Sequence, residues 1–348
     1  MITFCKINGE TIKFNNFNEY KNFHNIKDFF LEENRYCNLV HNYNLIKNND
    51  KTINYINEEI TIVKTSYPIY MIKEWIDISK LNKYIISKNP NAIYLLEQNP
   101  DMIVWDYLSL NQNSLHILEQ NVDKINWKWL SLNPKAIYLL EKYQNKINWS
   151  NLSKNPNAIP ILEKNKDKIN WWYLSNNYNA ISLLEEKIKI DPEKVTFYDK
   201  KKIDWCKLSI NPNAIHLLQG NQDKIDWFWL SQNLNAITLL EKNLDKIYWC
   251  QLSKNLNAIS LLENNVEKID WFYLSLNSNA IHILEKNSHK IYWKYLSMNP
   301  NAIHILEKNP NKIDWYYLSK NPSAMHLLEI NQHDIDWNNF SENIGIFD

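Results

Sequence analysis

The sequence predicts a mainly α protein, an α-solenoid of short two-helix repeats that follows a small α+β domain. The first observation is a pattern, S-x-N-P-N-A-I-x-L-L-E-x-N-x-D-K-I-x-W-x-x-L, that returns every 22 residues, as at Trp227, Trp249 and Trp271. A fixed period of this size is typical of arrays whose units bury their apolar faces against one another. The second is that proline and cap-forming residues recur at fixed places in the unit. The third is that the first 65 residues lack the pattern.

Each unit carries the signals of two short helices. Asn299-Pro300 begins the first, because Asn caps helices and proline is favoured at the first helical position. An apolar face follows, and Asn309 is expected to end the helix in the left-handed conformation. Asp314, before the repeat tryptophan, is expected to cap the second helix. A rival interpretation makes Ile-x-Trp a short strand, as in leucine-rich repeats of similar length, but the order L-x-x-L-x-L-x-x-N is missing.

All ten alanines occupy one slot of the unit, which indicates that helices approach closely there. The second unit has Ser114 in this slot, which is also small. The asparagine before proline and the one that ends the first helix recur in nearly every unit, and we expect their amides to form ladders that satisfy turn carbonyls and N–H groups. The alanines are Ala92, Ala136, Ala158, Ala180, Ala214, Ala236, Ala258, Ala280, Ala302 and Ala324.

Four segments follow from the pattern. Residues 1–66 form the separate N-terminal domain, and residues 67–86 form a linker and helical cap. Residues 87–340 hold eleven repeats, and residues 341–348 a short end. The fifth unit carries an insertion near 187–200, where the tryptophan step rises from 22 to 34. Two interpretations stay open: a tolerated surface loop, or a loop on a binding face.

The N-terminal segment has the order β-β-α-β-(β)-β. Asn8-Gly9 marks a hairpin turn, and the spacing of Phe23, Ile26 and Phe30 predicts a helix. Later apolar runs include Cys37-Asn38-Leu39-Val40, Leu45-Ile46, Lys51-Thr52-Ile53-Asn54-Tyr55 and Glu59-Ile60-Thr61-Ile62-Val63-Lys64. This order and the Lys51 to Tyr55 stretch resemble the ubiquitin-like β-grasp family. The resemblance implies that Leu39 and Val63 lie on a partner-binding face for a ubiquitin-pathway component. The C-terminal Gly-Gly needed for conjugation is absent.

The 22-residue motif resembles repeat arrays of giant DNA viruses of the mimivirus type, a family that implies no general biochemical activity. The resemblance implies a protein of the host cytoplasm or the virion. Consistent with this expectation, the start lacks the plan of a signal peptide, no apolar stretch is long enough to span a bilayer, and the four cysteines show no metal or disulfide spacing. We therefore do not expect secretion.

Charge and motifs indicate an interaction protein and not an enzyme. Acidic and basic residues number 39 each, so no overall field attracts nucleic acid or membrane. Motifs for phosphate loops, nucleophile elbows and metalloprotease helices are missing, and we expect no cofactor. His282, His304 and His326 share one slot in successive units, which is too widely spaced for one metal ion. We interpret this slot as an exposed groove or ridge.

The candidate partner-binding residues of the array are aromatic and lie two residues after the repeat tryptophan. They pack between layers, contact a peptide, or stack single-stranded bases. The recurrent lysine before isoleucine, as in Lys224 and Lys246, is expected to face Glu and Asp of the same unit, which disfavours nucleic acid. We predict an adaptor that binds a protein or peptide; the alternatives are a virion or scaffold component and a single-stranded nucleic-acid binder. The aromatic candidates are Tyr107, Trp129, Tyr173, Trp229, Tyr273, Tyr295 and Tyr317.

Overall fold

The computed structural model describes residues 69–194 and 197–347, together with the backbone of five strands nearer the N-terminus. The chain divides into two compact units. The first comprises residues 1–74, 90–101 and 347–348. The second comprises residues 75–89 and 102–346 and holds nearly all of the repeats.

Five strands of the first unit form one sheet. Its order is β2-β1-β5-β3-β4, in which β1 and β5 are parallel and the other neighbouring pairs are antiparallel. The helix expected around Phe23 to Phe30 and the stretch Lys51 to Tyr55 lie outside the described residues. The strands are β1 (Ile2–Lys6), β2 (Thr11–Phe14), β3 (Tyr36–His41), β4 (Asn44–Leu45) and β5 (Glu59–Thr65). The first unit also contains helix α3 (Ile93–Gln98).

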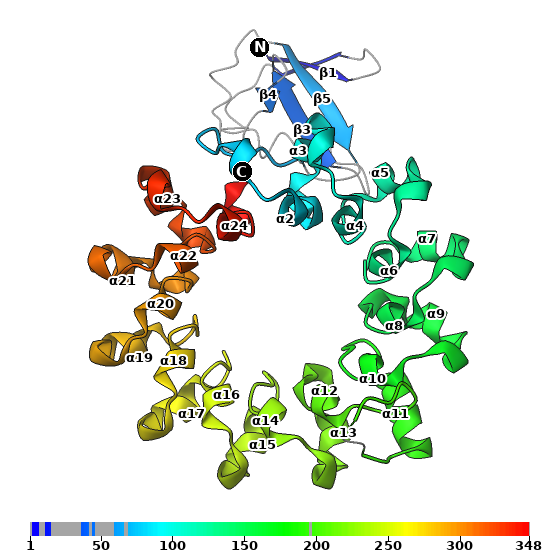
Figure 1. Ribbon diagram of the computed structural model, residues 1–348, viewed down its shortest axis with the longest axis vertical. Coiled ribbons are helices and arrows are strands. Elements are labelled where there is room, and N and C mark those ends of the chain that lie inside the picture. The colour runs from blue at the N-terminus through cyan, green and yellow to red at the C-terminus, as the bar shows by residue number, and fades with distance from the viewer. Residues whose placement is uncertain are drawn as a thin grey trace. The chain divides into compact units, whose positions relative to one another are not determined.

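The second unit is built from short helices in two rows, one inside the other (Figure 1). The prediction of a mainly α repeat array is confirmed. The inner row consists of α2 (Lys83–Lys88), α4 (Trp105–Leu108), α6 (Trp127–Leu130), α8 (Trp149–Leu152), α10 (Trp171–Leu174), α12 (Trp205–Ile210), α14 (Trp227–Leu230), α16 (Trp249–Leu252), α18 (Trp271–Leu274), α20 (Trp293–Leu296), α22 (Trp315–Leu318) and α24 (Trp337–Phe340). The outer row consists of α5 (Leu115–Glu119), α7 (Ile137–Lys142), α9 (Ile159–Glu163), α11 (Ile181–Ile190), α13 (Ile215–Gln219), α15 (Ile237–Glu241), α17 (Ile259–Glu263), α19 (Ile281–Lys286), α21 (Ile303–Glu307) and α23 (Met325–Ile330).

Helix boundaries follow the predicted caps, with two corrections. Asp314 caps α22 by accepting from the N–H of Tyr317 at 3.2 Å, so the cap before the tryptophan is confirmed. The strand interpretation of Ile-x-Trp is wrong, because Ile313 and Asp314 are two extended residues between a 3₁₀ turn and α22, which begins at Trp315. The left-handed conformation expected at Asn309 is also wrong, since its φ is −134°. Its side-chain amide donates to the carbonyl of Ile305 at 2.8 Å, and thus satisfies a helix-end carbonyl without a left-handed residue.

A buried ladder of asparagine amides joins each unit to the next, as predicted for the asparagine before proline. The amide nitrogen of Asn255 donates to the carbonyls of Ser231 and Asn233 at 3.2 and 2.9 Å, and its oxygen accepts from the N–H of Asn257. The asparagines that end the first helix bond within their own unit and form no such ladder. The ladder residues are Asn111, Asn133, Asn155, Asn177, Asn211, Asn233, Asn255, Asn277, Asn299, Asn321 and Asn343.

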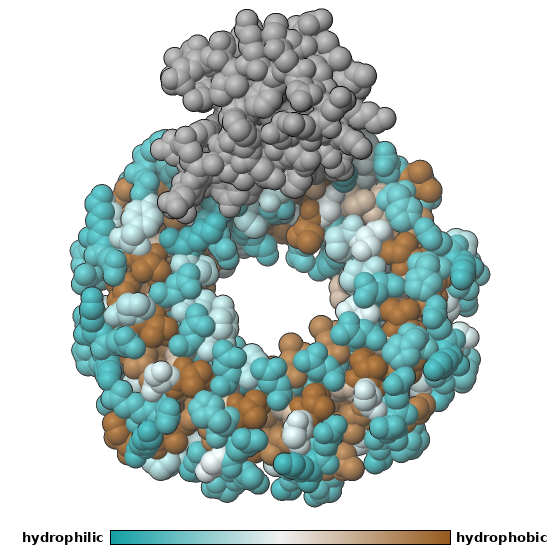
Figure 2. All heavy atoms as spheres, turned by 180° about the vertical axis from the view of Figure 1, so that it is seen from behind, coloured by the Kyte–Doolittle hydropathy of each residue, from teal (hydrophilic) through white to brown (hydrophobic). Residues whose placement is uncertain are grey.

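The alanine slot lies in the core, so its small size has the expected steric reason. Ala258 is fully buried, and every other alanine of the array is buried to the same degree. Ser114, which replaces alanine in the second repeat, is buried too. Its hydroxyl lies 2.8 Å from the carbonyl oxygens of both Leu108 and Asn111, which share its one proton. A buried hydroxyl needs such partners. On the surface, apolar side chains recur along the array between polar ones (Figure 2).

The array closes on itself through the same hydrogen bond that links consecutive inner helices, from the backbone N–H before one helix to the serine hydroxyl after the previous helix. Helix α2 begins 22 residues before α4 and takes the place of an inner helix. Asn82, its cap, donates its N–H to the hydroxyl of Ser341 in the last unit at 2.8 Å. Between ordinary neighbours, the N–H of Asn126 donates to the hydroxyl of Ser109 at 3.0 Å. The predicted cap at residues 67–86 is thus extended, because α2 crosses its boundary and packs against both ends of the array.

Aromatic contacts at this closing interface repeat the same correspondence. Lys80 Nζ lies 4.9 Å from the ring centroid of Trp337, and the equivalent Lys124 lies 4.5 Å from Trp105 of the preceding unit. Trp75 adds a contact without an equivalent elsewhere, with its ring 5.6 Å from that of Phe340. The second unit therefore forms a closed ring of helices (Figure 1).

Candidate functional site

The aromatic candidates lie in one column on the inner helices, on the side turned away from the buried leucines. Tyr107 contacts Trp129 of the next unit at 5.4 Å between centroids, and Tyr295 contacts Tyr317 at 5.5 Å. Phe272 packs 4.2 Å from Tyr295. Rings at this distance stabilise the stack of units. Much of the column therefore packs between layers, which was one of the three sequence interpretations.

Lysines lie over several rings of this column. Lys154 Nζ lies 3.9 Å from the ring centroid of Tyr173, and Lys254 lies 3.8 Å from Tyr273. In both cases the lysine follows the first serine of the same repeat and precedes its tyrosine by 19 residues. A cation this close to an aromatic face is held by the ring quadrupole. The face of the inner helices therefore combines rings with ammonium groups.

The predicted pairing of the lysine before isoleucine with carboxylates is wrong. Lys246 Nζ lies 4.8 Å from the ring centroid of Trp227 in the preceding unit, and Lys224 lies 5.2 Å from Trp205. The repeat tryptophans are mostly half-buried, which leaves one ring face open for the lysine; Trp205, 1% exposed, is the most buried of them. Each of these lysines is therefore held by the quadrupole of an aromatic ring and keeps its positive charge.

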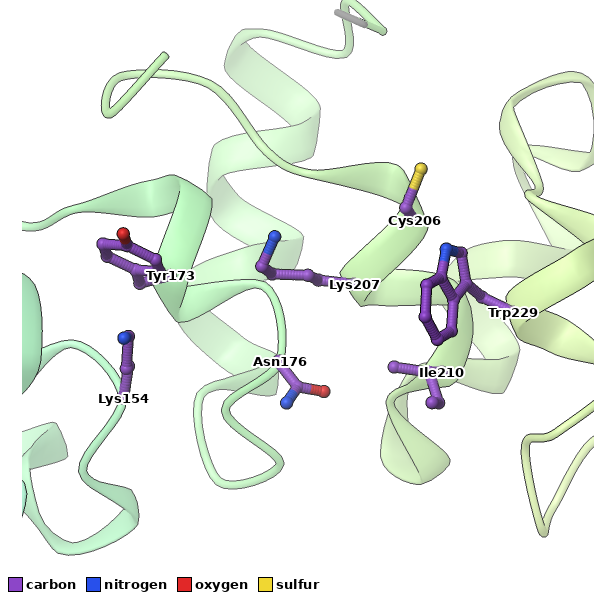
Figure 3. Close-up of a pocket in the computed structure, with 7 residues that line it drawn as sticks. All are labelled: Lys154, Tyr173, Asn176, Cys206, Lys207, Ile210 and Trp229. Atoms are coloured by element: carbon purple, nitrogen blue, oxygen red, sulfur yellow. The ribbon is translucent and has the colours of Figure 1, made fainter. Parts of the chain in front are cut away.

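The column is interrupted where Lys207 occupies the aromatic slot between Tyr173 and Trp229. A groove of about 550 Å³ opens there, across the helices α10, α12 and α14 (Figure 3). Trp229 is 39% exposed and forms one wall with Ile210. The lining residues are Lys154, Tyr173, Asn176, Cys206, Lys207, Ile210 and Trp229.

The groove is cationic. Lys207 forms an ion pair with the buried Asp204 and lies 4.8 Å from the ring of Trp172. Lys154 is exposed, and among the described residues no carboxylate pairs with it. Partial desolvation, followed by the charges of Lys207 and Lys128, lowers the pKa of Lys154. The ammonium groups of Lys207 and Lys128 therefore repel that of Lys154.

The thiol in the groove is not poised as a nucleophile. Cys206 Sγ donates to the carboxylate of Asp226 at 3.1 Å. Burial, then this hydrogen bond and the negative charge of Asp226, raise the pKa of the Cys206 thiol to about 12. The thiol consequently stays protonated at neutral pH, and the reactive thiolate is rare.

The insertion of the fifth unit packs beside this groove. Tyr198 accepts a hydrogen bond from the side-chain amide of Asn170 at 2.8 Å, and its ring lies 5.6 Å from Trp172 and 5.9 Å from Tyr173. Lys202 donates to the carboxylates of Asp191 and Glu193 at 2.9 and 2.6 Å. The described part of the insertion is therefore fixed to the array.

The histidine candidates lie on the outer helices, away from the aromatic column. His282, His304 and His326 each contact a glutamate of the preceding unit, at 2.8, 2.9 and 2.8 Å. These pairs are about half exposed, so each contributes little stability. Among the described residues no group of three potential ligands could hold a metal ion. The structure does not bring the histidines and the aromatic column into one site.

The two candidates of the N-terminal segment lie in neighbouring strands. Leu39 of β3 pairs with Ile62, and Val63 of β5 pairs with Asn38. Their side chains lie outside the described residues. Among the described residues, no helix is long and apolar enough to cross a membrane.

Sequence reasoning missed the lysines and the apolar wall of the groove. The signal was present at Lys207, the one cation in the slot that elsewhere carries an aromatic or an amide side chain. Lys154 could be located only from the fold of its repeat, which brings it over Tyr173, 19 residues later in the chain. Comparison of the chain with protein-family models, curated proteins and solved structures gave no match.

Proposed function

We propose that this chain is a non-enzymatic interaction protein, an adaptor whose array binds a protein or peptide along the inner helices. The observation that carries the proposal is the groove at Lys207, where the aromatic column opens and leaves Trp229 exposed. Exposed tryptophan in a concave site is typical of binding hot spots. The polar groups of the repeat itself form structural hydrogen bonds, because the asparagine amides bond neighbouring repeats and the serine hydroxyls bond consecutive inner helices.

The first unit supports a second contact surface. Its strand order, β2-β1-β5-β3-β4 with a parallel pair at β1 and β5, agrees with that of a ubiquitin-like β-grasp domain. We propose that this head docks onto a component that recognises ubiquitin-like surfaces, through one face of its sheet. The register pairs Leu39 with Ile62 and Val63 with Asn38, so Leu39 and Val63 belong to opposite faces, and a variant of both residues alters both faces. A chain with two such surfaces would hold two partners together, in the host cytoplasm or the virion that the repeat resemblance implies.

The test uses the full chain as bait and compares three variants with the unaltered chain. Tyr173→Ala with Trp229→Ala alters the groove, and Tyr138→Ala is the matched control, because Tyr138 is an exposed aromatic residue on the outer helix α7. Leu39→Asp with Val63→Asp alters the head. We expect the groove variant to lose one set of proteins, the head variant to lose another, and Tyr138→Ala to lose neither. Recovery of the same proteins by all variants would contradict the adaptor.

A scaffold role is the second candidate, favoured by one surface feature. Leu234 and Leu256 occupy the proline slot in consecutive units and are 41% and 38% exposed. Adjacent exposed leucines suit lateral contacts between copies of the chain. Sedimentation at rising protein concentration would test this: assembly that disappears in Leu234→Asp with Leu256→Asp supports a scaffold, and a monomer at all concentrations excludes it.

A further inference from the structure

We propose that the groove at Lys207 binds an acidic, extended polypeptide segment, with carboxylates on Lys154 and Lys207 and an apolar side chain against Trp229. This inference rests on the proposed function, because it names the chemistry of the partner at the same site. Charge, shape and the local break in the aromatic column support it.

Of the two lysines that line the groove, Lys154 forms no ion pair among the described residues, and Lys207 is paired with Asp204. A second carboxylate, Asp226, accepts from the lining thiol of Cys206. Lys207 uses one of its three donors on Asp204, which is buried beneath it, and an ammonium group can form two further hydrogen bonds. Among the described residues, the ammonium group of Lys154 contacts the ring of Tyr173 and forms no ion pair. A carboxylate bound between the two lysines would relieve their mutual repulsion, which also lowers the pKa of Lys154.

Apolar and hydrogen-bonding groups of the groove suit a polypeptide. Ile210 and Trp229 lie together at one end, with Tyr173 at the other and Lys207 between them (Figure 3). Asn176 offers both an amide donor and an amide acceptor, which is the pair that an extended backbone requires. A bound segment would therefore place one apolar side chain on the tryptophan and its acidic side chains on the lysines.

Single-stranded nucleic acid fits the face less well. Base stacking needs open ring faces along the column, whereas Tyr295 already packs against Tyr317 and Phe272. Lysines recur along the inner helices but lie over aromatic rings, and the chain has zero net charge, so no overall field attracts a polyanion. The arrangement favours a short acidic segment over a continuous polyanion.

The experiment measures fluorescence anisotropy of a labelled peptide of alternating glutamate and leucine, added to the full chain. Its probes for comparison are the same peptide with glutamine in place of glutamate, and labelled oligothymidylate. We expect the glutamate peptide to bind best, and Lys154→Glu to weaken its binding by about tenfold, because a reversed charge replaces attraction with repulsion. Trp229→Ala should weaken it by a similar factor.

Lys254→Glu is the matched control. Lys254 occupies the same slot as Lys154 and lies over a tyrosine at nearly the same distance, 3.8 against 3.9 Å, but it is not among the residues that line the groove. We expect Lys254→Glu to bind the peptide as the unaltered chain does. Circular dichroism of each variant checks that its fold is intact.

Several results would overturn the inference. They are equal binding of the glutamate and glutamine peptides, equal losses in Lys154→Glu and Lys254→Glu, or tighter binding of oligothymidylate. If the glutamate peptide fails to bind while captured proteins still depend on Tyr173 and Trp229, the groove takes a different partner and the adaptor function stands.

Discussion

Removal of one rung of the asparagine ladder should destabilise the array far more than removal of an exposed amide two residues away. Asn255 is fully buried and forms three hydrogen bonds: its amide donates to two carbonyls of the preceding unit, and its oxygen accepts from the N–H of Asn257. Asn255→Ala leaves these groups without their partner in a water-excluded site. At about 1–3 kcal/mol for each buried polar group left unsatisfied, the expected loss is about 3–6 kcal/mol.

Asn257→Ala is the control, because its amide makes one exposed bond, to the carbonyl of Leu234 at 2.9 Å. Its expected cost is about 0.5–1 kcal/mol. The isosteric Asn255→Asp keeps the acceptor and loses the donor, so a loss at least as large as that of Asn255→Ala would attribute the effect to the donor and not to packing. Urea denaturation followed by circular dichroism gives the free energies of unfolding. Equal losses for Asn255→Ala and Asn257→Ala would refute the ladder as a source of stability.

Three further outcomes follow from burial and charge. Trp205→Ala should lower the free energy of unfolding by about 3–5 kcal/mol, because Trp205 is 1% exposed. Trp249→Ala should lower it by about 1–3 kcal/mol, because Trp249 is half-buried. Equal losses in thermal or urea denaturation would contradict this ranking. Ala258→Leu should destabilise by about 1–3 kcal/mol through overpacking, and a neutral result would mean that the slot has free space. Cys206 should react with iodoacetamide at pH 8 about a thousandfold more slowly than free cysteine. Asp226→Asn should speed the reaction, because it removes the charge that disfavours the thiolate. Mass spectrometry would follow both rates, and fast alkylation of the unaltered chain would contradict the raised pKa of Cys206.

Local features of the repeat were predictable from its sequence because they depend on residues close together in the chain. The cap at Asp314, the buried alanine slot and the asparagine ladder each follow from side-chain chemistry at a fixed place in the unit. The conformation predicted for Asn309 is wrong, because its side-chain amide, and not a left-handed backbone, satisfies the helix-end carbonyl of Ile305. Helix-end preferences identify asparagine as a residue that can end a helix. They do not say whether it does so with a left-handed backbone or with a side-chain hydrogen bond.

Contacts between units were less predictable. Lys246 has acidic neighbours in its own unit, yet it lies over Trp227 of the preceding one. Closure of the array depends on Asn82 and Ser341, which are 259 residues apart and meet only because the curvature of many units adds up. The 22-residue period does not reveal whether the array closes, because the total curvature depends on the small rotation between each repeat and the next.

The groove arises from side chains and not from a break in the stack of units. The insertion adds residues between two units, yet the ladder continues across it: Asn211 still donates to the carbonyls of Ser175 and Asn177, at 3.2 and 3.3 Å. The backbone that supports the groove therefore keeps the geometry of a regular interface. What changes is the aromatic slot, where Lys207 stands between two rings and leaves the space above it open. In an array whose buried slots are all committed to the ladder and the core, a substitution in an exposed slot can create a binding site at little cost in stability, and this is where recognition by the array is expected to lie.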